Sequence, residues 1–256
     1  MLGRVRYALD ETGTMFAIAA EGFRHSWDVK SWWREWLEQC WFLARVTTLP
    51  VMLIAIPLGA TISLQVGQLA RQLGAQSATG SAVVLAIVRE VAPVATALLI
   101  SGAGGSAMSS DLGSRRIRDE LAAMEVMGVN PIWRLVTPRL WASSTVGVLL
   151  VSLVVFSGVA GGYFFNVVLQ GVTPGAYFEG ATSLLQTPDL VASLFKAWIF
   201  GFIAAMVATY KGMNCDLGPA GVGRAVNQSV VLTFILIFMA NYVITTLYFV
   251  IVPPKV

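Results

Sequence analysis

The chain has 256 residues, of which 56% are hydrophobic and only 12% are charged. Charged residues usually make up about 25% of a soluble domain, so this composition excludes a soluble domain of the same length. The formal net charge is +3. It does not indicate nucleic-acid binding, because the basic residues gather at the ends of apolar segments, as they do in membrane proteins.

Five apolar segments are long enough to cross a bilayer, which takes roughly 20 residues of helix because lipid leaves no backbone group unpaired. The uncharged stretch 140–178 is too long for one crossing. Its Gly161-Gly162 and Thr173-Pro174-Gly175 predict that the chain leaves the membrane near Asn166. We therefore predict an all-α, polytopic membrane protein with five transmembrane helices. They lie at about residues 46–69, 82–107, 137–165, 190–210 and 226–251.

The distribution of lysine and arginine predicts the orientation in the membrane. Residues 1–45, the loop after the second span and the loop after the fourth span are rich in basic residues, and the opposite side has only Arg71 and Lys255, with Lys196 near the interface. Because basic loops stay in the cytoplasm, the N-terminus is predicted to be cytoplasmic and the C-terminus extracytoplasmic. The predicted location is the plasma (inner) membrane.

Residues 1–45 form a segment of their own before the predicted membrane domain, residues 46–256. Indole rings prefer the headgroup level of a bilayer, so the segment is predicted to contain an amphipathic helix that lies on the cytoplasmic membrane surface. The alternative is a soluble helix whose tryptophans pack on a partner. The tryptophans concerned are Trp27, Trp32, Trp33, Trp36 and Trp41.

The chain has few residues of the types that catalyse reactions, bind metals or relay protons. Cys40 and Cys215 are the only cysteines and are predicted to pack in the fold without forming a disulfide. His25 is the only histidine, and no carboxylate relay crosses the membrane. These features argue against an ion-coupled carrier and an intramembrane hydrolase. Gly158-x-x-x-Gly162 is typical of close helix packing.

A charged island lies between the second and third predicted spans. It begins at Ser114, a candidate N-cap, and ends at Gly128, a candidate C′ residue, followed by Asn130-Pro131. We predict a cytoplasmic helix at residues 114–130, with Ile117, Leu121, Met124 and Gly128 on one stripe. It is too short to be stable alone. The pattern by itself favours a solvated helix that rests on its own bundle.

The sequence of this island resembles that of a known protein family. The run from Asp119 to Pro131, followed by Pro138-Arg139, is similar to the signature of MlaE/YrbE-type permeases, the membrane subunits of ABC transporters that work with MCE proteins. Residues 89–107 resemble the second helix of that family. Residues 195–201 and 218–226 resemble its fourth helix and following loop. The resemblance covers roughly residues 45–250.

The resemblance implies that the helix at 114–130 is a coupling helix that inserts into an ATPase. The chain has no Walker A sequence, so it is expected not to be an enzyme and to bind no cofactor or metal, while a separate ATPase uses ATP and Mg²⁺. The implied contact residues are Arg118, Asp119, Glu120, Leu121, Met124, Glu125, Met127 and Gly128.

The resemblance also places an Arg-Glu pair at Arg89 and Glu90, near Pro93. Adjacent helical residues point about 100° apart, so the two are not expected to pair with each other. The three residues are predicted to lie on the lipid path or to contact the MCE partner. The alternative for Arg89 is a side chain that snorkels to the interface.

The function implied is that of a permease that moves a fatty acid, a sterol or another lipid between the plasma membrane and an extracytoplasmic MCE tunnel, with import as the expected direction. The chain looks most like actinobacterial YrbE subunits. Its implied partners are a YrbE paralogue in a heterodimer, two ATPase subunits and an MCE hexamer. The alternatives are a homodimeric phospholipid permease, a membrane scaffold without transport, and a secondary carrier, for which inverted repeats are not found.

Overall fold

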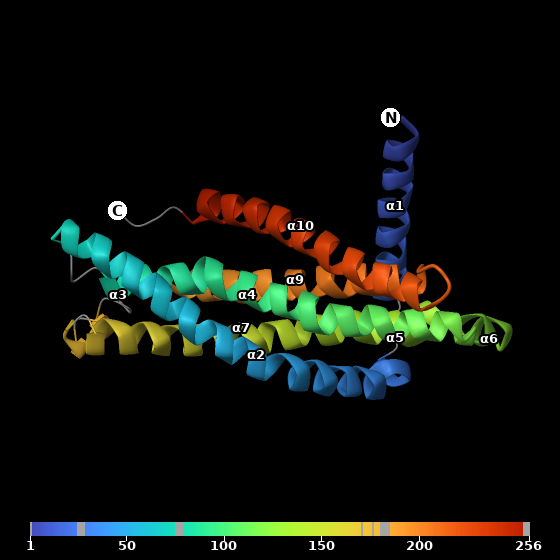
Figure 1. Ribbon diagram of the computed structural model, residues 1–256, viewed down its shortest axis with the longest axis horizontal. Helices are drawn as coiled ribbons and strands as arrows, with labels where there is room; N and C mark the ends of the chain where they lie inside the picture. The colour runs from blue at the N-terminus through green and yellow to red at the C-terminus, as the bar shows by residue number, and fades with distance from the viewer. Residues whose placement is uncertain are drawn as a thin grey trace. The chain divides into compact units, whose positions relative to one another are not determined.

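The computed structural model describes residues 2–24, 29–74, 79–169, 171–175, 177–179 and 185–252. Within these ranges the regular structure is helical and no strand occurs (Figure 1). His25, Trp27 and Lys255, which entered the sequence predictions, lie outside them.

The helices follow one another in chain order, and two of the helical stretches, residues 79–117 and 132–169, contain short π-helical segments, labelled η. The elements are α1 (Leu2–Arg24), α2 (Val29–Gln72), α3 (Thr79–Ala86), η3 (Ile87–Val91), α4 (Ala92–Leu99), η4 (Ile100–Gly105), α5 (Ser106–Ile117), α6 (Glu120–Val126), η5 (Ile132–Val136), α7 (Thr137–Phe164), η6 (Phe165–Leu169), α9 (Thr187–Met213) and α10 (Pro219–Ile251).

Among the described residues, five helical stretches are long and apolar enough to cross a membrane, which confirms the predicted all-α, polytopic class with five spans. They are Trp32–Gln72, Thr79–Ile117, Ile132–Leu169, Thr187–Met213 and Pro219–Ile251. Each contains one of the predicted spans and is longer. The difference arises because the prediction followed apolar residues alone, whereas Arg, Lys, Gln and Met at the ends are good helix formers and continue the helix.

Helix α2 runs without a break from Val29 to Gln72 and includes Pro50 and Pro57. At 1.5 Å per residue it is about 66 Å long, roughly twice the ~30 Å hydrocarbon core. The predicted division at residue 45 is therefore not marked by an end of this helix. The placement of its first part on the membrane surface stays a prediction.

The tryptophans of this segment divide between two environments. Trp32 is buried, and its ring centroid lies 6.5 Å from that of Trp141. Trp36 donates from Nε1 to Thr145 Oγ1 at 3.3 Å. Trp33 and Trp41 are exposed. The first two thus pack on the protein itself, and the other two remain available for a membrane surface or a partner.

The chain forms two compact units, and the division runs through all five long helices. Unit 1 comprises residues 1–46, 100–146 and 199–239. Unit 2 comprises residues 47–99, 147–198 and 240–256. Each unit therefore receives a part of every span.

Glycines set close helix contacts inside unit 2. A Cβ added at Gly59 would lie 2.0 Å from the carbonyl oxygen of Gly158, and one at Gly161 would lie 2.6 Å from that of Ile56. Only glycine lets two helix backbones approach so closely. The predicted close packing around Gly158-x-x-x-Gly162 is confirmed, and its partner is α2.

Unit 1 also has a close helix contact at a glycine, and it includes α1. A Cβ at Gly201 would lie 2.5 Å from the carbonyl oxygen of Ser143, where α9 meets α7. Helix α1 packs on η5, and Thr137 donates from Oγ1 to the carbonyl of Gly22 at 3.2 Å. The α1 helix therefore packs against the start of the helix that follows α6.

Candidate functional site

The predicted helix at 114–130 is two helical pieces in the structure. Helix α5 continues the second span through Ile117, so Ser114 lies inside it and donates from Oγ to the carbonyl of Asp111 at 2.8 Å. The prediction that Ser114 is an N-cap is wrong, because a serine inside a helix can satisfy its hydroxyl on its own backbone. After a turn at Arg118 and Asp119, α6 begins at Glu120.

The turn places Asp119 in the left-handed region, with a φ of 55°. Short polar residues tolerate this conformation better than other non-glycine residues. The predicted stripe from Ile117 to Gly128 is interrupted there, because the helix axis does not continue through the turn. Helix α6 itself keeps Leu121 and Met124 half-buried.

The C-terminal end of α6 agrees with the prediction. Gly128 has a φ of 77°, and its N–H donates to the carbonyl of Glu125 at 3.0 Å. The N–H of Val129 donates to the carbonyl of Met124 at 2.9 Å. These two bonds form a Schellman motif, in which the left-handed residue is usually glycine.

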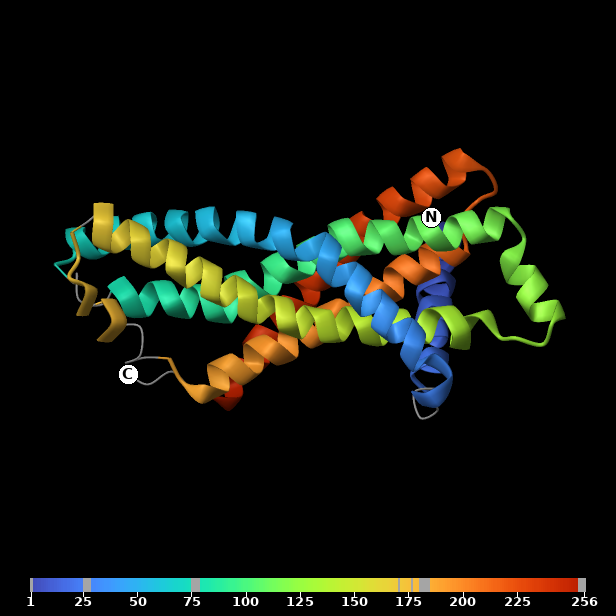
Figure 2. The ribbon, with the colours of Figure 1, turned by 90° about the horizontal axis from the view of Figure 1, so that it is seen from below.

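The next helix begins directly after this motif. Asn130 accepts the N–H of Ile132 on Oδ1 at 2.9 Å, and Pro131 occupies the first helical position, where its missing N–H costs no hydrogen bond. Helix α6 thus lies at a tight double turn between α5 and the η5–α7 helix, drawn in light green in Figure 2.

A chain of ion pairs joins α6 to the helices on both sides; we call Arg139, Asp111, Arg115, Glu120 and Arg118 the ion-pair chain. Arg139 Nη2 lies 2.6 Å from Asp111 Oδ2, and Arg115 Nε lies 3.2 Å from the same oxygen. Arg115 Nη1 is 3.7 Å from Glu120 Oε2, and Arg118 Nε is 2.7 Å from Glu120 Oε1. The guanidinium of Arg139 is buried and also donates to the carbonyl of Leu135 at 2.8 Å. The first residue of α6 is therefore connected to both α5 and α7.

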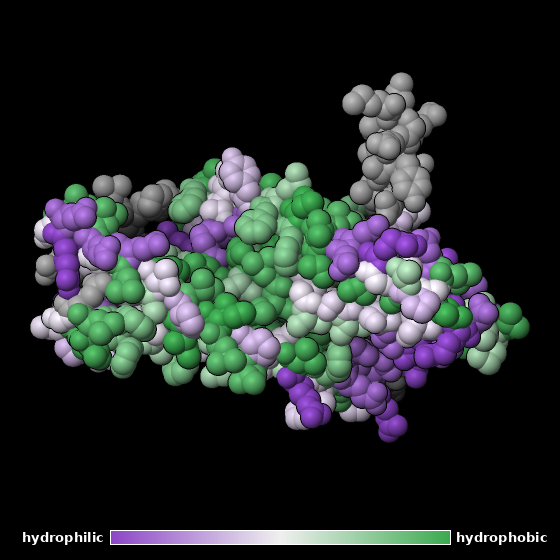
Figure 3. All heavy atoms as spheres, in the orientation of Figure 1, coloured by the Kyte–Doolittle hydropathy of each residue, from purple (hydrophilic) through white to green (hydrophobic). Residues whose placement is uncertain are grey.

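The outer side of α6 is apolar and open. No residue of α6 is buried, and the side chains after its midpoint include Val126, 89% exposed, and Met127, 70% exposed. In Figure 3 hydrophilic residues gather over the part of unit 1 that carries α5 and α6, with hydrophobic residues at its tip. An exposed apolar tip within a polar surround is typical of a protein–protein contact.

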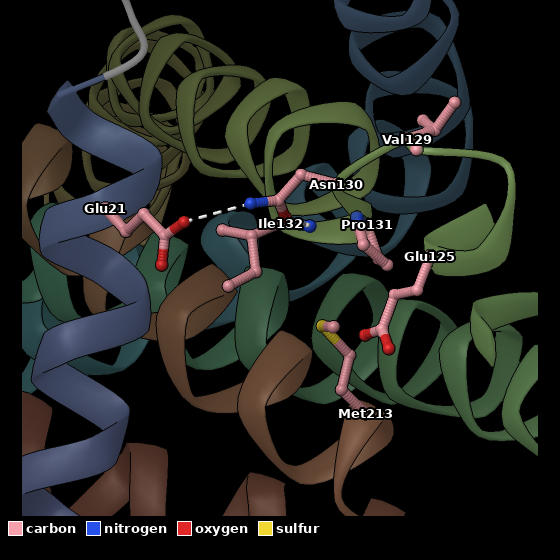
Figure 4. A pocket seen from close by; sticks show the side chains of 8 residues that line it. Glu21, Glu125, Val129, Asn130, Pro131, Ile132 and Met213 are labelled. Atoms are coloured by element: carbon pink, nitrogen blue, oxygen red, sulfur yellow. Dashed lines mark hydrogen bonds between the residues drawn. The ribbon is translucent and has the colours of Figure 1, made fainter.

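Two cavities in unit 1 border α6. One, of about 480 Å³, is lined by Glu21, Glu125, Asn130 and Met213 among others (Figure 4). Asn130 donates from Nδ2 to Glu21 Oε1 at 3.0 Å, which joins α1 to the double turn. The other cavity, of about 430 Å³, has Glu125 and Met213 in common with the first and adds Arg116, which donates to the carbonyl of Met213.

The predicted contact residues therefore have different roles in the structure. Arg118, Asp119 and Glu120 make the turn, and Arg118 and Glu120 also form an ion pair. Glu125, Met127 and Gly128 are exposed and make no ion pair described above. Sequence reasoning missed Val126 and Glu21. Val126 could have been found as an apolar residue opposite the Leu121 face, but no local signal connects Glu21 with Asn130.

A second polar site lies in unit 2, and it contains the predicted Arg89 and Glu90. Arg89 Nε is 2.6 Å from Asp189 Oδ1, and Glu90 Oε1 is 2.9 Å from Lys196 Nζ. As predicted, Arg89 and Glu90 do not pair with each other. They lie in η3, and such π-helical turns are frequent at functional sites.

Residues of α10 complete this polar cluster. Glu90 also accepts hydrogen bonds from Asn241 Nδ2 at 2.9 Å and Thr245 Oγ1 at 3.0 Å. The hydroxyl of Tyr248 donates to Asp189, and the guanidinium carbon of Arg89 lies 5.8 Å from the centre of the Tyr248 ring. Since Arg89 is engaged in this way, it is not simply a cation that snorkels to the interface. Pro93, the third predicted residue, is buried in α4.

The sequence reasoning did not single out Asp189 and placed Lys196 near the interface only. The side chain of Asp189 is fully buried and that of Lys196 is 4% exposed. The two are seven residues apart in α9, which places them on one face of the helix. That spacing is the signal that could have found them. In the part of the chain that the structure describes, no three His, Cys, Asp or Glu residues could hold a metal ion.

Comparisons with known proteins agree with this architecture. The family model described as Permease MlaE matches residues 36–247. A probable ABC transporter permease protein of Rickettsia felis is 33% identical over 191 residues, which cover 75% of this chain and 74% of the relative. A probable ABC transporter permease protein of Synechocystis is 30% identical over 234 residues, or 91% and 89% of the two chains.

A third relative is named for its transport system. The intermembrane phospholipid transport system permease protein MlaE of Haemophilus influenzae is 27% identical over 214 residues, which cover 83% of this chain and 82% of the relative. The family match and these relatives define the class of the protein, the membrane subunit of an ABC transporter rather than its ATPase. The chain belongs to the MlaE permease family.

Proposed function

We propose that this chain is the permease of an ATP-driven ABC transporter that moves lipid between the plasma membrane and an extracytoplasmic MCE tunnel. Membership of the MlaE permease family supports this, as does the phospholipid transport system for which the Haemophilus relative is named. The observation that carries the proposal is α6, a helix with no buried residue and an exposed Val126-Met127 tip. In this proposal the tip inserts into the ATPase.

The proposed assembly has two permeases, two ATPase subunits and an MCE hexamer. ATP and Mg²⁺ bind to the ATPase and not to this chain. The N-terminus and α6 lie in the cytoplasm, as the distribution of Lys and Arg predicts. The proposed partner permease is a YrbE paralogue, the proposed direction is import, and the proposed cargo is a fatty acid or a sterol.

The proposed mechanism is mechanical. Helix α6 is held by the Schellman motif at one end and by the ion-pair chain at the other. A displacement of α6 by the ATPase would therefore move α5 and the first part of α7 together with it. Nucleotide binding would then shift the population between two permease conformations, because the ATPase fits one of them better.

Arg89 and Glu90 are proposed to lie on the lipid path or at the contact with the MCE protein. Both keep part of their side chain exposed, 21% for Arg89 and 42% for Glu90. Ionisable groups in membrane spans are costly and usually mark a functional path or face a cavity. Pro93 would act only through the packing of α4.

A homodimeric phospholipid permease is the second candidate, and the name of the Haemophilus relative favours it. Mass spectrometry of the purified complex separates the two candidates, because a heterodimer contains two different permease chains and a homodimer contains one. The lipid that co-purifies identifies the cargo class.

The coupling role is tested with Val126→Asp combined with Met127→Asp. These side chains are exposed and make no ion pair, so the change leaves the turn intact, whereas a substitution of Glu120 would also break its pairs with Arg115 and Arg118. Loss of an apolar contact of the hot-spot kind, at least about 2 kcal/mol, weakens association with the ATPase more than about tenfold. Co-purification of the ATPase measures it.

The matched control is Leu73→Asp. Leu73 is an equally exposed apolar residue that directly follows the first span, on the side proposed to be extracytoplasmic. It is expected to leave the association unchanged. If the ATPase still co-purifies with the double variant and its ATP hydrolysis still depends on the permease, the coupling role of α6 is wrong. If ATP hydrolysis never depends on this subunit, the chain is a scaffold.

A further inference from the structure

An apolar groove runs along the second half of α7 in unit 2. Its volume is about 510 Å³. Its floor consists of Val84 and Val88, which are buried and pack against Val155, Val159 and Leu185. The α7 residues that line it recur at intervals of three and four, so they form a single stripe of the helix. They are Ser152, Val155, Phe156, Val159, Ala160 and Tyr163.

The groove lies in membrane-spanning structure. Its two walls belong to the candidate spans Thr79–Ile117 and Ile132–Leu169. The medium around such helices is hydrocarbon, so the groove is filled either by lipid or by another protein. None of the described residues that line it is charged, so the groove suits an apolar chain better than an ion.

The length and the ends of the groove match one leaflet of a bilayer. From Ser152 to Tyr163 the helix rises about 16 Å, close to half of the ~30 Å hydrocarbon core. Tyr163 lies six residues before the end of the span at Leu169, and its ring centroid is 5.1 Å from that of Phe178 and 5.6 Å from that of Tyr177. Aromatic rings of this kind gather at the level of the headgroups.

The wall residues do not suit a second helix. Close helix pairs in membranes need small residues four apart, so that the two backbones can approach. Here Ser152 and Ala160 are separated by Phe156, which is 73% exposed and lies on the same stripe. A flexible chain can bend around that ring, whereas a rigid helix cannot.

We propose that this groove binds one acyl chain of a bilayer lipid, in the leaflet at the Tyr163 end, with the chain terminus toward the middle of the membrane. The described residues that line the groove all belong to unit 2, and none of them belongs to α6 or makes the ion pairs of the polar cluster around Glu90. The proposal concerns bound lipid and not transport. It therefore stands or falls independently of the coupling role of α6.

The test uses a photoreactive p-benzoylphenylalanine in place of Phe156, in the full complex. The complex is purified in detergent without added lipid and then irradiated, and the mass of the permease is measured. We expect an adduct with the mass of a co-purified lipid. The same photoreactive residue in place of Leu53, another exposed span residue outside the groove, is expected to give none, because lipid at an open surface is removed by detergent.

Filling the groove supplies the second arm. Ala160→Trp is added to the protein that carries the photoreactive residue at position 156, and it is expected to lower the adduct yield about tenfold or more. A tenfold loss of affinity corresponds to the lost burial of only about two methylene groups of the lipid. Val155→Phe is the smaller replacement if the Trp variant does not elute as the intact complex. Equal adduct yields at positions 156 and 53 overturn the proposal, and so does a covalent pair of permease chains in place of the lipid adduct.

Discussion

The two polar networks of this permease are built from the same ion pair in different surroundings. In unit 1, Arg139 Nη2 lies 2.6 Å from Asp111, and in unit 2, Arg89 Nε lies 2.6 Å from Asp189. The ion-pair chain of unit 1 then continues to Glu120, which is half-buried, and to Arg118, which is exposed. The cluster of unit 2 instead continues to Lys196, which is buried, and to hydrogen-bonding residues of α10.

This difference in burial predicts that the two networks contribute differently to the stability of the fold. Exposed ion pairs contribute little to stability because water competes for both charges. Buried pairs are strongly destabilising when one partner is removed, because the other charge remains in an apolar surrounding. The outer members of the ion-pair chain therefore add little to the free energy of unfolding, whereas the polar cluster contributes much more by holding η3, α9 and α10 together.

The largest effect is expected for Asp189→Ala. The change removes the ion pair of Arg89, the acceptor of the Tyr248 hydroxyl and the acceptor of the Gln186 N–H. Loss of a buried partner typically destabilises by about 3–5 kcal/mol. Thermal unfolding of the purified permease in nanodiscs measures it.

The matched control is Asp216→Ala, which removes an exposed Asp–Arg pair, 3.0 Å from Arg224. Its expected cost is below about 1 kcal/mol. Equal shifts of the unfolding temperature for the two variants would show that burial does not separate the two kinds of pair. Arg89→Met combined with Asp189→Leu is expected to recover most of the loss, because no unpaired charge remains.

An intermediate effect is expected for Asp111→Ala. The change removes the ion pair of the buried Arg139 and leaves its hydrogen bond to the carbonyl of Leu135. A buried polar group that loses its partner costs about 1–3 kcal/mol. Thermal unfolding again provides the measurement, and Asp111→Asn, which keeps an oxygen acceptor, should lose less. A cost for Asp111→Ala no greater than that for Arg118→Ala would contradict the inner position of this residue in the ion-pair chain.

The smallest effect is expected for Arg118→Ala. Arg118 is exposed and pairs with Glu120, which also has Arg115 nearby. The expected loss of stability is below about 1 kcal/mol, and salt should reduce it further. Unfolding temperatures at low and high salt provide the check. A loss as large as that of Asp189→Ala would mean that the ion-pair chain is as rigid as the polar cluster.

Some features of the candidate sites follow from the local sequence. Gly128 was correctly predicted as the C′ residue of α6, because a positive φ at a helix end selects glycine. Ser114 was wrongly predicted as an N-cap, because a serine before a charged run is compatible both with a helix start and with a helix that simply continues. The turn fell instead at Asp119, where no side-chain cap marks the start of α6.

The sequence by itself determined the all-α class, the five spans and the position of the charged island. It could do so because lipid admits only helices with internally paired backbones, so the length of an apolar run decides whether it crosses. Only the tertiary structure decided which charges meet. Arg89 and Asp189 are 100 residues apart in the chain, and Glu21 and Asn130 are 109 apart. Pairs so distant depend on how the helices pack, and no local propensity specifies that.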